Sequence, residues 1–397
     1  MRQLALIAAL SGTPVLAQDP APRRIATYNV SMTRGAPGGL IADLLAGDDR
    51  IAAVAEVIQR VRPDVILLNE VDRDPDGRAL TLFRERYLAV SQNGAEPIDY
   101  PHAVAPPSNT GVPTGHDLDG DGATDGPGDA QGYGAFEGQY AFALLSRYPI
   151  DTAGVRTFQR LLWADMPGSY LAGDPELAAF YGGAAADLRL SSKTHAILPV
   201  RVGGRVLQIV AAHPTPPVFD GPEDRNGKRN HDEIRLIADL VSGADWPVDD
   251  AGRAGGLPDG AAFVILGDMN ADPADGDGVQ GAMRQLLDHP AVQGSEADAA
   301  LIPSSEGGPA AAAEQAGANE GQSGNPAFDT ADFGFAGAGA PDDAPGNLRV
   351  DYALPSVAGL TLTGGGVFWL APGDPLFPLG EWPASDHRLV WIDVVMD

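Results

Sequence analysis

The chain has 397 residues, of which 44% are hydrophobic and 20% are charged, a balance typical of a globular protein rather than a disordered one. Its formal net charge of -28 disfavours broad electrostatic capture of nucleic acid, so any bound phosphate would be met locally by a metal ion or a few cations. The absence of cysteine excludes disulfide bonds, thiol nucleophiles and thiolate metal ligands, which leaves oxygen and imidazole donors for a metal site.

The N-terminus has the pattern of a short secretory signal. Arg2 precedes an apolar run at residues 4–10, and Val15-Leu16-Ala17 stands directly before Gln18. This pattern predicts cleavage after Ala17 and a secreted or periplasmic protein, with a disordered start as the alternative. No other apolar stretch approaches the ~18 residues of a membrane span, so we expect the mature chain to be soluble.

Short apolar runs that are rich in β-branched residues and bounded by polar, Pro or Gly residues predict buried strands. In chain order they are residues 25–28, 65–68, 142–145, 196–202, 206–212, 263–267, 349–354 and 389–395. Amphipathic helical patterns precede Pro63 and Gly243. Because strands and helices do not alternate regularly, as they would in a doubly wound sheet, the pattern favours a sandwich of two mixed β-sheets flanked by helices.

Three long segments between these elements predict insertions. They are residues 91–138, rich in Asp, Gly and Pro; residues 160–187; and residues 304–346, rich in Ala and Gly. Loops of this length are usually functional or disordered. No repeat or linker separates two complete patterns, so we expect residues 18–397 to form one domain.

Carboxylate, amide and imidazole side chains stand where the predicted strands end or just before one begins. These residues are Asn29, Glu70, His213, Asp268, Asn270, Asp351, Asp386 and His387. Taken singly, each has a simpler interpretation: Asp268 as a turn cap, Asp351 as the partner of a nearby arginine, His213 beside Pro214 as a loop residue. Their appearance together, in six ordered segments, favours an active site, because independent caps would not reproduce that order.

This ordered set resembles the endonuclease/exonuclease/phosphatase superfamily, which shares the four-layer α/β/β/α sandwich of deoxyribonuclease I. The most specific matches are Gly267-Asp268-Met269-Asn270 after a strand and Ser385-Asp386-His387 before one. The resemblance covers essentially the whole mature chain and implies a metal-dependent hydrolase of phosphate esters, as a secreted bacterial-type member. Asn69, where the family often has Gln, and the three insertions depart from the family pattern and leave the substrate open.

The resemblance implies roles around one metal ion and one phosphate. Glu70 is expected to bind Mg²⁺ or Mn²⁺, which prefer carboxylate and water oxygens, with Asn29 and Asp386 completing or supporting the shell. Asp268 and Asn270 are expected to hold the attacking water and contact the phosphate, with Asp268 as the general base. Their two-residue spacing would put both side chains on one side of an extended segment.

Asp351 and His387 resemble the family's Asp–His pair, in which the carboxylate orients the imidazole and raises its pKa so that it meets the phosphate as imidazolium. His213 is expected to face the same phosphate from another strand. Lys193 and His195, on a predicted strand, are expected to pair across a sheet and stand outside this site, with a position that reaches the cleft as the alternative.

Two further clusters carry weaker predictions. Asp117, Asp119 and Asp121, followed by Gly122, resemble the first half of a calcium loop, although the twelfth position is Gly128; the alternatives are structural Ca²⁺ and a solvated acidic loop. A basic cluster stands close after His213 and before a helix expected to begin near Asn230. Its residues are Arg225, Lys228 and Arg229. It is expected to bind substrate phosphate at a helix N-terminus, with an internal ion-pair network as the alternative.

The sequence therefore predicts a monomeric phosphomonoesterase or phosphodiesterase that acts on a small or lipid-linked phosphate ester. One alternative is a secreted endonuclease on DNA or RNA, which would need a cationic groove along several phosphates where this chain has few basic clusters. A second is a non-catalytic binding module on the same fold, and the intact set of predicted catalytic residues argues against it.

Overall fold

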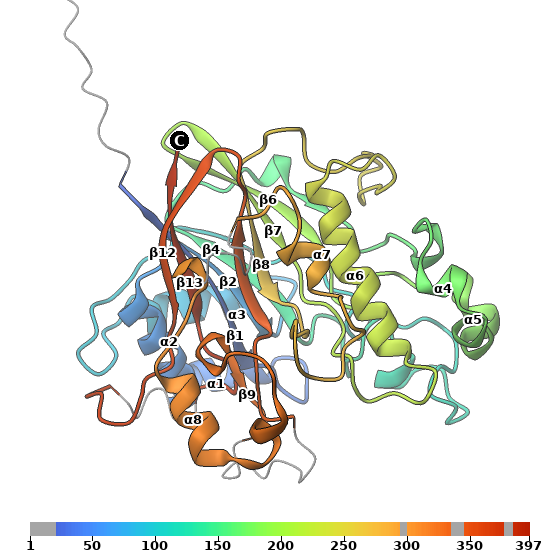
Figure 1. Cartoon of the computed structure of the whole chain (residues 1–397), viewed down its shortest axis with the longest axis horizontal. Coiled ribbons are helices and arrows are strands. Elements are labelled where there is room, and N and C mark those ends of the chain that lie inside the picture. Colours follow the sequence, from blue (N-terminus) through green and yellow to red (C-terminus); the bar gives the residue numbers. More distant parts are fainter. Residues whose placement is uncertain (1–20, 294–299, 335–344, 377–383) are drawn as a thin grey trace, which may run out of the picture.

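The computed structural model describes residues 21–293, 300–334, 345–376 and 384–397. The predicted signal segment, residues 1–17, lies outside the described residues. Two β-sheets lie face to face, and helices pack on the outer face of each sheet (Figure 1). The predicted four-layer α/β/β/α sandwich of two mixed sheets is therefore confirmed.

The larger sheet has six strands in the order β12-β13-β1-β2-β4-β3. They are β1 (Arg23–Met32), β2 (Val65–Val71), β3 (His102–Val104), β4 (Ala141–Ser146), β12 (Leu360–Val367) and β13 (Val390–Met396). The helices near this sheet are α1 (Gly39–Ala46), α2 (Asp49–Val61) and α3 (Arg78–Phe83). Helix α2 buries Ile51, Val54 and Ile58 on one face. It ends before Pro63 because a proline disfavours the helical conformation of the residue that precedes it.

The second sheet has five strands in the order β11-β8-β7-β6-β5. They are β5 (Arg156–Thr157), β6 (Ala196–Val202), β7 (Arg205–Ala211), β8 (Phe263–Asp268) and β11 (Asp351–Pro355). Helices α6 (Arg225–Val241) and α7 (Arg284–Leu287) pack on its outer face. Strands β7 and β8 run parallel, as do β1 and β2, whereas the other named pairs in the two sheets are antiparallel, so both sheets are mixed.

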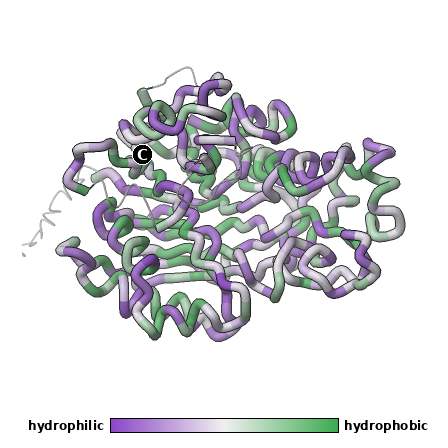
Figure 2. The backbone as a smooth tube through the Cα atoms, turned by 90° about the horizontal axis from the view of Figure 1, so that it is seen from below, coloured by the Kyte–Doolittle hydropathy of each residue, from purple (hydrophilic) through white to green (hydrophobic). Residues whose placement is uncertain are grey.

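Side chains along the central strands alternate between two apolar cores. On β1, Ala26, Tyr28 and Val30 pack toward the helices, whereas Ile25 packs between the sheets. Figure 2 shows the strands as largely hydrophobic segments in the middle of the molecule, with hydrophilic residues concentrated in the outer turns. Polar residues at the ends of these strands can therefore meet in the space between the two sheets.

The structure differs from the expected elements in several places. The segments predicted as insertions contain the short helices α4 (Tyr170–Gly173), α5 (Pro175–Tyr181) and α8 (Gly307–Gln315), and the strand β9 (Ala331–Asp332), which pairs with β10 (Asn347–Leu348) directly after the third segment. Helix α6 begins at Arg225 and not near Asn230, so the basic cluster lies inside its first turns. Among the described residues, none of the helices combines the length and apolarity needed to cross a bilayer.

Candidate active site

Predicted site residues converge at one end of the space between the two sheets. On β1, Ile25 packs between the sheets, and the period of two along a strand carries Asn29 to the same face. On β8, Leu266 packs there and Asp268 is two positions further on. The same alternation applies to β7 and β11. The residues that share this face are Asn29, His213, Asp268 and Asp351.

Glu70 reaches the same space because the backbone of β2 is distorted there. Alternation alone would direct its side chain toward the helices, as for Leu68. Instead, the pairing of β2 with β4 shifts register between Asn69 and Val71, and Glu70 has a φ of 59°. A non-glycine residue in this conformation costs about 1–3 kcal/mol, and such strain concentrates at functional positions. The distortion turns the carboxylate toward Asn29, whose Nδ2 donates to Oε1 at 3.1 Å.

Gly267 allows the ends of β7 and β8 to approach each other closely. A Cβ atom at this position would lie 1.9 Å from the carbonyl oxygen of Ala212, so no side chain fits. The approach brings Asp268 beside His213, with 3.4 Å between Nε2 and Oδ2. The chain then turns, because Asn270 has a φ of 50° and donates its backbone N–H to Asp268 Oδ1 at 2.9 Å. The expectation of an extended segment through Asn270 is therefore wrong.

The side-chain amide of Asn29 connects groups from three elements. Its Nδ2 donates to Glu70 Oε1 and to Asp268 Oδ2 at 3.0 Å, and it lies 3.5 Å from His387 Nε2. Its Oδ1 accepts the backbone N–H of Ser31 at 3.1 Å. Because Asn29 is 1% exposed, the amide holds these groups in fixed positions inside the protein. The Asn29 atom that faces the carboxylates is Nδ2, a hydrogen-bond donor that cannot bind a metal ion. Only Oδ1 could serve as the predicted metal ligand, and that role stays a prediction.

The structure brings Asp351 and His387 together as a buried pair, with 2.8 Å between Oδ2 and Nδ1. Burial alone would lower the pKa of His387, but the carboxylates of Asp351 and Asp268 outweigh burial and hold that pKa well above its ordinary value. Its Nε2 lies 3.7 Å from Asp268 Oδ2. Burial also raises the pKa of Asp268 to about 6, although the charge of His387 acts in the opposite direction. The pair therefore presents an imidazolium beside a carboxylate that can accept a proton near neutral pH.

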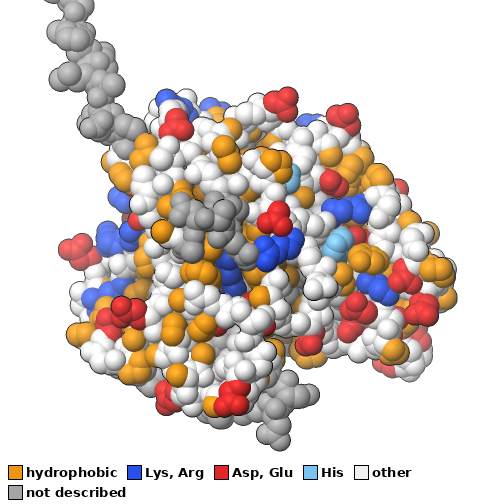
Figure 3. Space-filling view, in the orientation of Figure 1, with side chains coloured by type: hydrophobic (Ala, Val, Ile, Leu, Met, Phe, Trp, Pro, Cys, Tyr) orange, Lys and Arg blue, Asp and Glu red, His pale blue; other side chains and the backbone are white. Residues whose placement is uncertain are grey.

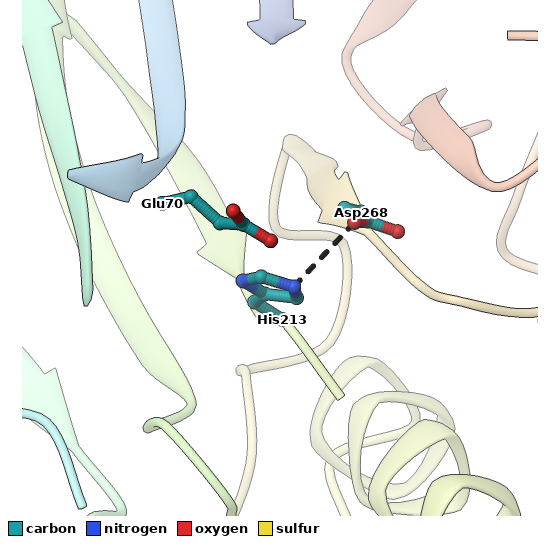
Figure 4. Close-up of side chains that lie close together, drawn as sticks. All are labelled: Glu70, His213 and Asp268. Carbon is teal, nitrogen blue, oxygen red and sulfur yellow. Dashed lines mark ion pairs between the residues drawn. The ribbon is translucent and has the colours of Figure 1, made fainter. Parts of the chain in front are cut away.

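Glu70, His213 and Asp268 form a donor set that fits a divalent cation. Each offers one ligand atom, and these atoms all lie within 4.8 Å of one another. Figure 4 shows the two carboxylates on either side of the imidazole, which follows β7. Burial lowers the pKa of His213 well below its ordinary value, so the neutral ring has a lone pair to give to a metal. Burial also raises the pKa of Glu70, although the charge of His387 and the hydrogen bond from Asn29 act in the opposite direction.

The sequence matches the model of the Endonuclease/Exonuclease/phosphatase family over residues 26–387. The chain belongs to this family. The structure is similar to that of an endonuclease/exonuclease/phosphatase from Beutenbergia cavernae DSM 12333, with a TM-score of 0.51 and 18% identity over 95% of this chain and 72% of that one. At this identity the similarity shows the fold alone.

Two further solved structures match with lower TM-scores. An endonuclease/exonuclease/phosphatase family protein from Leptotrichia buccalis C-1013-b has a TM-score of 0.47 and 14% identity, covering 94% of this chain and 99% of that one. The human Nocturnin catalytic domain with bound sulfate has a TM-score of 0.48 and 14% identity, covering 95% of this chain and 94% of that one. No curated protein matches the sequence at a significant level.

In this endonuclease/exonuclease/phosphatase chain, the last predicted metal ligand lies at the edge of the site. Asp386 is exposed, and its Oδ1 accepts a hydrogen bond from Ser385 Oγ at 3.4 Å. Its charge acts on both Glu70 and His387, raising the pKa of each. Asp386 therefore lies near the site without direct contact to the donor set, and its metal-ligand role stays a prediction.

The predicted phosphate-binding cations take part in an internal network, which was the alternative interpretation. Lys228 Nζ lies 2.6 Å from Asp174 Oδ2, and Arg225 pairs with Glu223. Arg229 is buried and donates to three backbone carbonyls. Within the described part of the chain, no hydrogen bond or ion pair joins these cations to the carboxylates of the site. Their substrate-binding role stays a prediction.

The predicted calcium loop is an exposed acidic turn. Asp117, Asp119 and Asp121 each offer a carboxylate oxygen, and these oxygens lie within 4.8 Å of one another. Backbone N–H groups of the same loop already donate to them, with Asp117 accepting from Gly120 at 2.7 Å and from Gly122 at 3.0 Å. Structural Ca²⁺ at this loop stays a prediction.

The segment predicted as the third insertion contributes residues to the site that the sequence did not indicate. Thr330 Oγ1 accepts the backbone N–H of Asp351 at 2.9 Å, and Ala331 forms a β-bridge with His387. The ring of Phe333 meets that of His387 edge to face, with 5.5 Å between centroids. The order Asp-Thr-Ala-Asp-Phe carries no recognised motif, so only the folded chain reveals that this segment supports the Asp–His pair.

Proposed function

We propose that residues 18–397 form one exported catalytic domain that hydrolyses phosphate esters with the help of Mg²⁺ or Mn²⁺. The observation that carries this proposal is the convergence on Asn29 Nδ2, which lies within 3.5 Å of Glu70, Asp268 and His387 side-chain atoms. A metal-ligand carboxylate, a proton acceptor and an imidazolium are the groups that phosphoester hydrolysis requires.

Each residue would have a separate task in the reaction. Glu70 and His213 would hold the divalent cation, which when bound supplies Lewis-acid activation of water and neutralises phosphoryl charge. Asp268 would accept the proton of the attacking water, a role supported by its raised pKa. His387, kept charged by Asp351, would donate its Nε2–H to a phosphoryl oxygen as negative charge develops there. Asn29 would hold these groups in their relative positions through its hydrogen bonds.

The proposed substrate is a small or lipid-linked phosphate ester rather than a nucleic acid. The net charge of -28 repels an extended polyanion. On the face in Figure 3, Lys and Arg side chains lie in small groups beside Asp and Glu, and they do not form a continuous basic band. Such a surface favours a ligand with one phosphate near the site over one with many phosphates in a row.

Export rests on the sequence of residues 1–17. The test is N-terminal sequencing of the protein recovered from the periplasm or medium of a bacterial host, where we expect the mature chain to begin at Gln18. An uncleaved chain that stays in the cytoplasm would contradict export without affecting the proposed chemistry.

The catalytic proposal is tested with purified residues 18–397 and a panel of substrates. Nitrophenyl phosphate, bis-nitrophenyl phosphate, sphingomyelin and DNA are each incubated with Mg²⁺, Mn²⁺ or EDTA. We expect metal-dependent turnover of at least one small or lipid ester. Faster turnover of DNA than of every other substrate would favour the nuclease alternative. No turnover of any substrate with either metal would favour a non-catalytic binding module.

A further inference from the structure

A buried lysine that the predicted site did not include lies beside it. Lys193 precedes β6, whose pairing with β7 places Ala196 opposite Ala211. Continuing that pairing by a few residues brings Lys193 next to the segment at His213, and its Nζ donates to the carbonyl oxygen of Pro214 at 3.3 Å. The residue is 8% exposed, so its ammonium group lies inside the protein and not at the surface.

The ammonium group of Lys193 is poorly satisfied. It has three N–H donors, and the described residues supply one long hydrogen bond and no carboxylate within 4.0 Å. Burying a charge with so few partners is costly, and a ligand that completed the contacts of the ammonium group would offset that cost. Phosphate oxygens are suitable partners, because an ammonium group binds them as a compact point charge.

Local structure does not depend on this charge. Glu233, the acid whose charge acts most strongly on Lys193, already accepts the backbone N–H groups of Ser192 and Thr215 at 2.7 Å each, one on each carboxylate oxygen. The Lys193 backbone is held separately, because its carbonyl oxygen accepts the N–H of Asn109 at 2.7 Å. The side chain is therefore available for a ligand.

The electrostatic environment connects Lys193 with the candidate active site. Burial lowers the pKa of Lys193, and the charges of Glu233, Glu70 and Asp268 act against burial. In turn, the charge of Lys193 adds to burial in lowering the pKa of His213. The ammonium group thus lies close enough to Glu70 and Asp268 for its charge to be felt where a phosphate would bind.

We propose that Lys193 binds a non-bridging oxygen of the phosphate in the candidate active site, as a second protein cation besides His387. This inference rests on the proposed function for the presence of a phosphate there. It adds a phosphate-binding residue on the β6 side, whereas His387 approaches from the β13 side. The phosphate would then supply the acceptor atoms that the ammonium group lacks.

The test uses Lys193→Met, which keeps the length of the side chain and removes the charge, and Lys193→Gln, which keeps a donor for Pro214. The control is Arg205→Met, a loss of one exposed positive charge at the far end of the same β6–β7 hairpin. The dissociation constant of inorganic phosphate is measured by calorimetry in Mg²⁺, and that of Mn²⁺ is measured without phosphate. Thermal unfolding checks that each variant is folded.

Both Lys193 variants should bind phosphate about 10-fold or more weakly, the usual effect of losing a charged hydrogen bond. They should bind Mn²⁺ more tightly, because a positive charge near Glu70 and Asp268 has been removed. Arg205→Met should change neither constant. A general loss of structure would weaken the binding of both phosphate and Mn²⁺. Weaker phosphate binding together with tighter Mn²⁺ binding therefore identifies the effect of the lost charge.

Two results would overturn the inference: no phosphate binding by the wild-type protein, or equal phosphate affinity in the wild type and the Lys193 variants. Failure of the proposed function would appear differently. In that case the wild-type protein would bind phosphate through Lys193 but would hydrolyse none of the esters tested.

Discussion

Replacing Asp351 with Asn should remove the charge that keeps His387 protonated while leaving the shape of the pair unchanged. At 2.8 Å, the attraction between two unit charges is about 6 kcal/mol for an effective dielectric constant of about 20, which is an upper limit. Asp268, 3.7 Å from the other ring nitrogen, remains and retains part of the effect. We therefore expect a loss of about 3 kcal/mol of transition-state stabilisation, or about 100-fold in kcat/KM at pH 8.

The dependence of kcat/KM on pH provides the decisive assay. In the wild type, the raised pKa keeps His387 charged at higher pH than an ordinary histidine. In Asp351→Asn that pKa falls, so the charged form is lost at lower pH and the basic limb of the profile moves in the same direction. Thermal unfolding should be close to that of the wild type. A variant with the wild-type rate and an unmoved basic limb would refute this reasoning.

Substitutions at three other positions test separate parts of the structure. Glu70→Gln should weaken Mn²⁺ binding at least about 10-fold in a calorimetric titration, because it removes the anionic ligand; unchanged affinity would place the metal elsewhere. Phe333→Ala should lower kcat by about 3- to 10-fold with metal affinity unchanged, because the edge-to-face contact that holds His387 is lost, and Phe333→Leu should restore part of the rate. Burial raises the pKa of Asp329 to about 7. The contribution of this side chain to the stability of the folded protein is therefore fully present below its pKa in the unfolded chain, about 4, and is lost as the pH rises through 7. Asp329→Asn should therefore be more stable than the wild type by about 1–3 kcal/mol at pH 8 and lose that advantage toward pH 5 in urea unfolding; an equal difference at both pH values would contradict the assignment.

The central strands were predictable because the side chains on both of their faces are buried. Both faces of β1 and β8 are covered, one by the other sheet and one by helices, so each strand appears in the sequence as a largely apolar run that ends at a buried polar residue of the site, Asn29 or Asp268. The polar residues at the ends of these runs were predictable for the same reason. Strand β12 was missed because Gly364, Gly365 and Gly366 interrupt its apolar pattern, although all three pair with β13.

The directions of individual side chains depended on backbone distortions that no periodic pattern contains. Alternation along β2 predicts that Glu70 faces the helices, and only the register shift with a positive φ turns it into the site. The left-handed turn at Asn270 is of the same kind. Phe333 and Thr330 reach His387 and Asp351 through the fold of a long insertion, which local sequence does not determine.

The most direct test of the proposed activity is the turnover of bis-nitrophenyl phosphate by the wild type and by Asp268→Asn, each in EDTA and after addition of excess Mg²⁺. The substitution keeps the side-chain size and replaces the proton acceptor between Asn29 and the two histidines. We predict turnover by the wild type only with Mg²⁺, and a rate at least about 1,000-fold lower in a folded Asp268→Asn. Wild-type turnover that persists in EDTA, or an Asp268→Asn variant with the wild-type rate, would contradict the proposed site.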